Sequence, residues 1–221
     1  MSKSVFISRN LSDDDSLIHR LTKSGLDVRA QTLIETKSIE FDRNIPRTDW
    51  IFFSSKNTVQ FFFEGKIELT TQKLAAVGLG TASYLEQFGT IDFIGQHIDT
   101  HKTALEFKKI VGSESVLFPQ AKHGLRTIQA VFDSKNSVEI ICYETKETPF
   151  PIGHPDVLLF SSPSNVESFF KSNTLLAHQR IIVFGHSTGE ALQQHGIVEF
   201  VIPRSLNEND LFEAIISTVE S

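Results

Sequence analysis

A pattern in residues 49–94 recurs without a gap in residues 156–201. The spacing between the two copies is constant, as Asp49 and Asp156 show (156 − 49 = 107). Identical residues recur at this spacing in the pairs Phe53/Phe160, Ser54/Ser161, Ser55/Ser162, Val59/Val166, Phe62/Phe169, Phe63/Phe170, Gly78/Gly185, Thr81/Thr188, Leu85/Leu192, Gly89/Gly196 and Phe93/Phe200. Solenoid repeats have periods of about 20–50 residues. The repeat therefore indicates two similar lobes, and we expect each to present the same polar residues to a cleft between them.

The composition excludes several classes of protein. The formal charge is −6 and no run of Lys or Arg is present, which argues against nucleic acid as a partner. The single cysteine, Cys142, excludes an internal disulfide and a cysteine-based metal cluster. The sequence has neither a charged-then-apolar leader nor an apolar run of the ~18 residues that a membrane span needs. We therefore expect a cytoplasmic protein without a membrane partner.

Short apolar runs alternate with amphipathic stretches, which is typical of parallel α/β sheets. Strands are predicted at 5–7, 28–34, 50–53, 75–77, 91–94, 116–118 (ended by Pro119), 138–143, 157–160, 180–184 and 198–202. Helices are predicted at 13–24, 58–63, 81–88, 103–111, 124–133, 164–171, 188–195 and 208–219. The fold class is thus α/β, with two flavodoxin-like, parallel-sheet lobes.

The segments around the two copies predict which parts of the chain form each lobe. Two strands follow the first copy but only a helix follows the second, and the N-terminal β-α-β segment cannot bury a core alone. We expect residues 1–34 and 155–221 to form one discontinuous lobe, and residues 40–140 to form the other as an insertion. Residues 35–39 and 141–154 would be a two-stranded connector. A simple division into N-terminal and C-terminal halves is the alternative.

Polar turns follow several of the predicted strands. Ligands of open α/β sheets bind beyond the carboxyl ends of the strands, where helix N-termini expose backbone N–H groups. The turns with this character are 54–57 with its copy 161–165, 78–81 with its copy 185–188, and 119–124. Ser, Thr and Asn at these positions are also ordinary helix N-caps, so the duplication carries more weight than any single residue.

Standard catalytic and cofactor motifs are absent from the sequence. The glycines of Gly78-Leu79-Gly80 do not complete a G-x-G-x-x-G loop, because residue 83 is Ser. The histidines show no metal-ligand spacing, and we expect no metal ion. His186 is interpreted as an exposed loop residue. Tyr143 ends a strand at the crossover between the lobes, so its hydroxyl group is a candidate for the cleft.

The order and spacing of these turns resemble uroporphyrinogen-III synthases over nearly the whole chain. The matching segments are Ile51–Val59, Ala76–Ala82, Val116–Gln120, Cys142–Thr145, Leu159–Ser164 and Val183–Thr188. The resemblance implies two α/β lobes joined by a two-stranded connector, with the N-terminal segment packed in the C-terminal lobe. It also implies a lyase of haem-type tetrapyrrole biosynthesis that uses no metal or organic cofactor.

The substrate implied by the resemblance is hydroxymethylbilane, a linear tetrapyrrole with eight carboxylates. The enzyme would close the macrocycle to uroporphyrinogen III, inverting ring D and losing water, by holding the flexible chain in a reactive orientation. Tyr143 matches the connector tyrosine of the family and would act as a general acid. The residues expected to bind substrate are Arg9, Ser55, Lys56, Asn57, Thr81, Gln120, Ser162, Ser164, Ser187 and Thr188. Further cations could come from Lys122, Arg126 and Arg204.

Departures from the family pattern affect single side chains. Phe53-Ser54-Ser55 stands where the family often has Thr-Ser-Pro, and His186-Ser187 stands where Pro-Thr is common. Two other functions stay open: a non-catalytic two-lobe protein that binds a small anion, and a flavodoxin-like regulatory domain. No predicted strand ends in the phospho-acceptor Asp that a response regulator needs. We expect a monomer.

Overall fold

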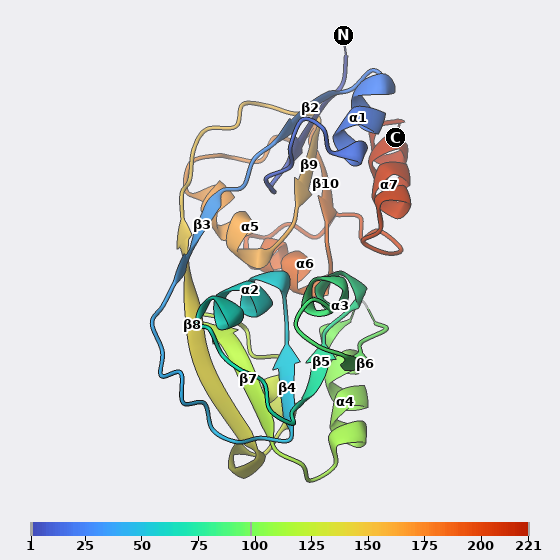
Figure 1. Cartoon of the computed structure of the whole chain (residues 1–221). Helices are drawn as coiled ribbons and strands as arrows, with labels where there is room; N and C mark the ends of the chain where they lie inside the picture. Colours follow the sequence, from blue (N-terminus) through green and yellow to red (C-terminus); the bar gives the residue numbers. More distant parts are fainter. Residues whose placement is uncertain (1, 98, 221) are drawn as a thin grey trace. The chain divides into compact units, whose positions relative to one another are not determined.

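The structure is a computed structural model that describes residues 2–97 and 99–220. The chain divides into two compact units. Unit 1 comprises residues 1–35 and 146–221, and unit 2 comprises residues 36–145. Each unit is an α/β structure with a largely parallel sheet (Figure 1), which confirms the predicted fold class.

Unit 1 contains a parallel sheet in the order β10-β9-β1-β2, with helices on both faces. Val5 and Ile7 of β1 face one helical layer, whereas Phe6 faces the other. The elements in chain order are β1 (Ser4–Ile7), α1 (Ser16–Lys23), β2 (Asp27–Ala30), β9 (Val157–Phe160), α5 (Pro163–Phe170), β10 (Arg180–Val183), α6 (His186–Gln194) and α7 (Glu208–Glu220).

Unit 2 contains a sheet in the order β8-β7-β4-β5-β6, with β3 beside β8 at its edge. The elements of this sheet and its helices are β3 (Ile34–Ser38), β4 (Trp50–Phe53), α2 (Lys56–Glu64), β5 (Lys73–Ala76), α3 (Leu79–Leu85), β6 (Ile91–Ile94), α4 (Thr100–Val111), β7 (Val116–Ala121), two 3₁₀ turns η1 (Gln129–Val131) and η2 (Ser134–Asn136), and β8 (Ser137–Glu147). Ile51 and Phe53 of β4 pack under α2 and α3, and Trp50 and Phe52 pack under α4.

β3 and β8 carry the chain across the boundary between the units. The boundary falls between Glu35 and Thr36 in β3, and between Thr145 and Lys146 in β8. The N–H of Ile39 donates to the carbonyl of Cys142 (2.9 Å), and the N–H of Thr148 donates to the carbonyl of Leu33 (2.8 Å). From Leu33 to Ile39 the residue numbers rise, while those of the bonded partners fall from Thr148 to Cys142. The two strands are therefore antiparallel.

The internal repeat extends to the hydrogen bonds at the amino ends of the central strands. The Asp49 carboxylate, just before β4, accepts from the N–H and the hydroxyl of Ser115 (both 2.7 Å), just before β7. The Asp156 carboxylate, just before β9, accepts from the N–H and the hydroxyl of Ser4 in β1 (2.8 and 2.9 Å). β1 of unit 1 therefore occupies the place that β7 has in unit 2.

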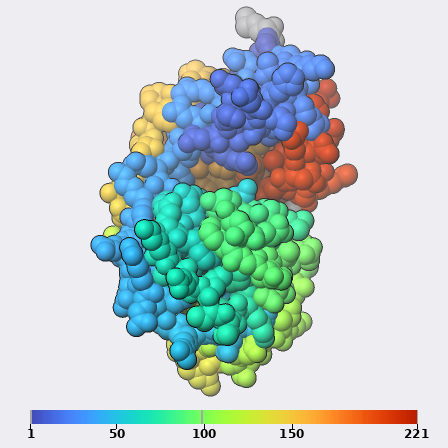
Figure 2. Space-filling view, viewed as in Figure 1, coloured from blue at the N-terminus to red at the C-terminus, as the bar shows by residue number. Residues whose placement is uncertain are grey.

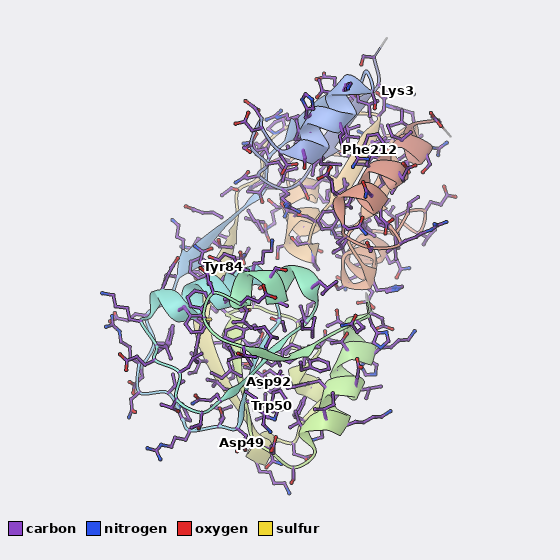
Figure 3. All side chains as sticks on the ribbon, turned by 45° about the vertical axis from the view of Figure 1, so that its right-hand side comes forward. Lys3, Asp49, Trp50, Tyr84, Asp92 and Phe212 are labelled. Carbon is purple, nitrogen blue, oxygen red and sulfur yellow. The ribbon has the colours of Figure 1, made fainter. Side chains whose placement is uncertain are left out.

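Figure 3 shows where this hydrogen-bonded end lies in unit 2. Asp49 and Trp50 lie at one end of the unit, and Tyr84 of α3 lies near the other. Since β4, β5 and β7 are parallel, their carboxyl ends all lie at the edge away from Asp49. That edge carries the polar turns.

Two predicted strands are wrong in their extent. β2 ends at Ala30, because the Leu33 N–H donates to the Asn165 side chain (2.8 Å) and the Leu33 carbonyl accepts from the Ser168 hydroxyl (2.5 Å) instead of joining β1. The predicted strand at 198–202 is reduced to an isolated bridge between Val201 and Ile182.

The segment after β7 also differs from its prediction. Pro119 does not end β7, because β4 pairs only with the earlier residues Val116 and Leu117 and needs no N–H donor at position 119. The helix predicted at 124–133 is wrong, since only the turn η1 forms there. Arg126 has a left-handed φ of 56°, which no α-helix accommodates. Its guanidinium group is held by Glu139 of β8 (2.6 and 2.9 Å).

Candidate active site

In unit 1, the helices that follow the neighbouring strands β1 and β9 pack on opposite faces of the sheet. α1 follows β1 and packs on the face of Val5 and Ile7. α5 follows β9 and packs on the face of Phe6. Such a switch point leaves a crevice beyond the carboxyl ends of the two strands, where open α/β sheets bind their ligands. Arg9 and the turn 161–165 lie directly after these strand ends.

Unit 2 has an equivalent switch point between β4 and β7. α2 follows β4 and packs on the face of Ile51, whereas the segment after β7 places Ile128 and Phe132 on the face of Trp50. The turns 54–57 and 119–124 follow these two strands. The sequence-predicted residues of each unit are therefore concentrated at the end of the sheet where a ligand is expected.

Ser55 begins α2 as its N-cap and forms a capping box with Thr58. The Thr58 N–H donates to the Ser55 hydroxyl (3.1 Å), and the Ser55 N–H donates to the Thr58 hydroxyl (3.1 Å). Ser162 occupies the corresponding position of α5 and accepts from the Asn165 N–H (3.3 Å). The capping interpretation is correct for both serines, and their turns are fixed by it.

Tyr143 of β8 meets Ser55 from a distant part of the chain. Its ring stacks on Phe61 of α2 with 5.0 Å between centroids, and it is 7% exposed. Burial raises the pKa of Tyr143 above its ordinary value of 10, while a side-chain hydrogen bond with Ser55 lowers it by a smaller amount. The phenol is therefore neutral at physiological pH. The structure thus brings together the predicted acid and a predicted substrate-binding residue.

Lys56 is exposed at the first position of α2. Its Cε lies 3.9 Å from the position that a β-carbon would take at Gly80, so the side chain passes along the start of α3. Within residues 2–97 and 99–220, the Lys56 amine has no hydrogen bond or ion pair. Asn57 is half-buried beside it. A free cation and the first turns of two helices give this edge a positive potential.

The other predicted residues of unit 2 are less accessible. Thr81, in the first turn of α3, is 7% exposed, and its N–H donates to the Gly78 carbonyl (3.1 Å). Gln120, in β7, is 5% exposed, and its carbonyl accepts from the Cys142 thiol (3.5 Å). Of the additional cations, Lys122 lies 3.7 Å from Glu144 and Arg126 is paired with Glu139, so both charges are already compensated.

In unit 1 the turn after β9 is tied to the end of β1. The Ser161 N–H donates to the Ser8 hydroxyl (2.9 Å), and the Ser161 hydroxyl donates to the Ser8 carbonyl (2.7 Å). Asn165 is 2% exposed and links Ser162 to Leu33. Ser164 is half-buried at the surface of the same turn.

The turn after β10 begins α6 without a side-chain cap at Gly185. His186 is exposed, as expected, but it is the first residue of α6 and not a loop residue. Ser187 is half-buried. Thr188 is 3% exposed, and its N–H donates to the Gly185 carbonyl (3.1 Å). Its side chain is therefore packed against its own unit, as is that of Thr81. Arg9 and Arg204 are exposed.

Two residues that organise the site were not predicted. Ser8 carried no sequence signal, because its role depends on the pairing of β1 with β9. Asn165 stands in the duplicated turn, but its partners Thr32 and Leu33 come from another part of the chain. Among the described residues, no group of three or more His, Cys, Asp or Glu is placed to hold a metal ion. No described helix is both long and apolar enough to cross a membrane.

Comparisons with known proteins agree with this arrangement. The family model described as uroporphyrinogen-III synthase HemD matches residues 15–213. A uroporphyrinogen-III synthase of Chlorobaculum parvum is 25% identical over 246 aligned positions, which cover 99% of this chain and 100% of the relative. A porphyrin biosynthesis protein HemD of Ruminiclostridium josui is also 25% identical, over 91% of this chain, and this chain spans 46% of that longer protein.

Solved structures show the same fold. The chain superimposes with a TM-score of 0.66 on a mutant uroporphyrinogen III synthase of Thermus thermophilus, at 14% identity and with 99% of each chain covered. It superimposes equally well, also at 0.66, on the uroporphyrinogen-III synthetase of Helicobacter pylori, at 19% identity and with 98% and 99% covered. The family model matches well over half of the sequence. The chain therefore belongs to the uroporphyrinogen-III synthase family.

Proposed function

We propose that this protein converts hydroxymethylbilane to uroporphyrinogen III, inverting ring D and releasing water. The observation that carries the proposal is the family match over residues 15–213, combined with the polar turns at the switch point of each sheet. The enzyme would be a lyase that needs no metal or organic cofactor. We also propose that it acts as a monomer in the cytoplasm.

The first step needs a proton for the departing hydroxyl group on ring A. Tyr143 is the proposed donor, because burial keeps its phenol protonated. The Ser55 hydroxyl accepts from the Thr58 N–H, so its own proton is available for the Tyr143 oxygen. The Tyr143 proton is then free for the substrate. The C–O bond breaks, water leaves with that proton, and an azafulvene cation remains on ring A.

The second step is a matter of orientation. The substituted carbon of ring D must attack the cation before the unsubstituted carbon does, which gives a spiro intermediate. The bond from ring D to its original methylene bridge then breaks and re-forms at the other carbon of that ring, and the proton that ring D loses replaces the one that Tyr143 gave. Holding the chain in one geometry favours this path through effective molarity. We propose carboxylate contacts for Lys56 and Arg9, and polar contacts for Ser55, Asn57, Thr81, Gln120, Ser162, Ser164, Ser187 and Thr188. The buried threonines would contribute through their turns.

An assay of isomer composition tests the proposal. Hydroxymethylbilane is supplied to the purified protein, and the products are oxidised and separated into type I and type III porphyrins. The type I isomer forms spontaneously, so catalysis appears as type III product at a rate proportional to the protein concentration. Formation of type I alone at the spontaneous rate would refute the proposal and favour a non-catalytic binding protein.

A further inference from the structure

A buried amide side chain joins the two chain segments that form unit 1. These segments, residues 1–35 and 146–221, lie side by side at the surface, where Figure 2 shows them blue against red. Asn165, in the first turn of α5, is 2% exposed. Its carbonyl oxygen accepts from the Leu33 N–H (2.8 Å) and from the Thr32 hydroxyl (3.2 Å), both of the first segment.

The orientation of this amide is fixed by its backbone partner. A backbone N–H can only donate, so the oxygen of Asn165 must face Leu33 and the NH₂ group must face the other way. The NH₂ group donates to the hydroxyls of Ser162 (3.0 Å) and Ser161 (3.3 Å). The connection to Leu33 therefore determines that the turn after β9 receives donors and not an acceptor.

The two serine hydroxyls of this turn differ in what they can still offer. The Ser161 hydroxyl donates its own proton to the Ser8 carbonyl (2.7 Å). The Ser162 hydroxyl accepts from the NH₂ group and from the backbone N–H of Asn165 (3.0 and 3.3 Å), which occupies both of its lone pairs. It donates to no acceptor in the part of the chain that the structure describes. The half-buried Ser162 can therefore offer a ligand only its proton.

The matching turn of unit 2 is built differently. Position 58 corresponds to position 165 in the repeat (165 − 58 = 107), but it is Thr. The Thr58 hydroxyl donates to the Ser55 carbonyl (2.7 Å) and not to the Ser55 hydroxyl, which meets Tyr143 instead. The serine of unit 2 thus contacts the proposed acid, whereas the serine of unit 1 is held as a donor for a ligand.

We propose that Asn165 is a positioning residue, which fixes the Ser162 hydroxyl as a donor to a carboxylate of the substrate. The inference rests on the proposed function, in which Ser162 contacts the linear tetrapyrrole. A carboxylate accepts hydrogen bonds and donates none, so a fixed donor suits it. Asn165 acts on substrate binding without touching the reacting atoms, and its loss should raise KM with little effect on kcat.

Asn165→Asp tests this role, because it removes the donors and keeps the acceptor for Leu33. The introduced carboxylate would take the Ser162 proton, which turns this hydroxyl away from the substrate. We expect the KM for hydroxymethylbilane to rise about tenfold or more, with kcat changed by less than about twofold. Because the Leu33 N–H keeps its partner, the urea midpoint should fall less than in Asn165→Ala.

A second substitution shows whether Asn165 acts through Ser162. Ser162→Ala alone should also raise the KM about tenfold, because the donor itself is lost. Added to Asn165→Asp, it should have little further effect, because the introduced carboxylate has already taken the proton. An equal effect of Ser162→Ala in both backgrounds would overturn the inference, since Ser162 would then bind substrate independently of Asn165.

Two controls separate this effect from lost stability and from added charge. Asn173→Ala, beyond the end of α5, removes an amide that accepts from the Ile152 N–H (2.9 Å) and donates to two backbone carbonyls (3.0 and 3.1 Å). Asn136→Asp adds a negative charge just before β8 in unit 2. The first should lower the urea midpoint and the second should change the net charge, and neither should change the KM.

Binding of an unreactive relative of the substrate separates this inference from the proposed function. The probe is a linear tetrapyrrole in which a methyl group replaces the hydroxymethyl group, so it keeps the carboxylates but cannot cyclise. Its Kd, measured by calorimetry, should rise in Asn165→Asp and in Ser162→Ala as the KM does. Such a rise supports the inference even if no type III product forms. An unaltered Kd in Asn165→Asp, or no binding of the probe to the unaltered protein, overturns it even if type III product forms.

Discussion

At the scale of single residues, a lysine at the first position of a helix is electrostatically unfavourable, and Lys56 occupies that position in α2. We expect Lys56→Gln to stabilise the protein by about 0.3–1 kcal/mol, because the helix dipole no longer opposes a positive charge. The same change should raise the KM for hydroxymethylbilane, because a carboxylate partner is lost. Urea unfolding and steady-state kinetics measure the two effects. Lys23→Gln, in the last turn of α1, is the control, and it should raise neither the free energy of unfolding nor the KM.

Tyr143→Phe tests the proposed acid. The phenylalanine keeps the stacking on Phe61, so stability should change little. The kcat should fall by about 10- to 100-fold, less than a full general-acid contribution, because water can donate the proton in place of the phenol. The only other tyrosine, Tyr84, provides the control Tyr84→Phe, which should retain full activity. An unaltered kcat in Tyr143→Phe would remove Tyr143 from the mechanism.

Cys142 offers a residue-scale test of the packing of unit 2. Burial raises the pKa of its thiol to about 12, so almost no thiolate is present at pH 8. The native protein should therefore resist a thiol reagent such as Ellman's reagent, and the protein unfolded in urea should react with one equivalent. Rapid reaction of the native protein would show that β8 is accessible at this point.

At the scale of secondary-structure elements, one side chain connects α5 to the segment between β2 and β3. The Asn165 carbonyl oxygen accepts from the Leu33 N–H and the Thr32 hydroxyl, and its amide donates to Ser162. Asn165→Ala would leave the buried Leu33 N–H without a partner. We expect a loss of about 1–3 kcal/mol in the free energy of unfolding, measured in urea. Ser164→Ala, in the same turn, should cost clearly less.

Elements were predictable where a local pattern sufficed. The buried apolar runs located β4 and β9, and the helices after them were predicted from residues 58 and 164, within two residues of their starts at Lys56 and Pro163. Ile128 and Phe132 have the spacing of a helix, but they belong to a loop that packs on the α4 side of the sheet and are buried there. That loop is fixed by the pairing of Arg126 with Glu139 on β8, a contact that periodicity does not encode.

The candidate site also has features that a local sequence pattern predicts and features that depend on the packing of distant elements. Its turns could be predicted, because residues at the ends of parallel strands gather at one edge of a sheet. The contact of Tyr143 with Ser55 could not, because it depends on β8 lying beside β7. The burial of Thr81 and Thr188 also depends on how α3 and α6 pack against their sheets, which the matching hydroxyl groups in the sequence do not reveal.

At the scale of the whole molecule, the two aspartate–serine connections predict how stability depends on pH. Hydrogen bonds from Ser115 lower the pKa of Asp49, and those from Ser4 lower the pKa of Asp156, below the ordinary value of 3.8. Each carboxylate therefore contributes stability above pH 3.8, and that contribution is lost as the pH falls toward the lowered pKa. Asp49→Asn and Asp156→Asn should thus lower the urea midpoint at pH 7, with a smaller difference at pH 3.

The control for this prediction is Asp13→Asn. Asp13 is exposed and has no hydrogen-bond partner among the described residues. Its substitution should leave the urea midpoint nearly the same at both pH values. An equal loss at pH 7 and pH 3 for Asp49→Asn or Asp156→Asn would mean that the carboxylate charge contributes nothing, and that only the shape of the side chain matters.

The route of the chain through its two units has a consequence for protein synthesis. On the ribosome, residues 1–35 of unit 1 are translated before unit 2, but β1 has no neighbour on one side until β9 is translated. Unit 2, residues 36–145, is by then complete and can collapse on its own. Nascent β1, α1 and β2 must therefore wait, exposing apolar side chains to chaperones for most of the elongation time, before they close onto the final segment.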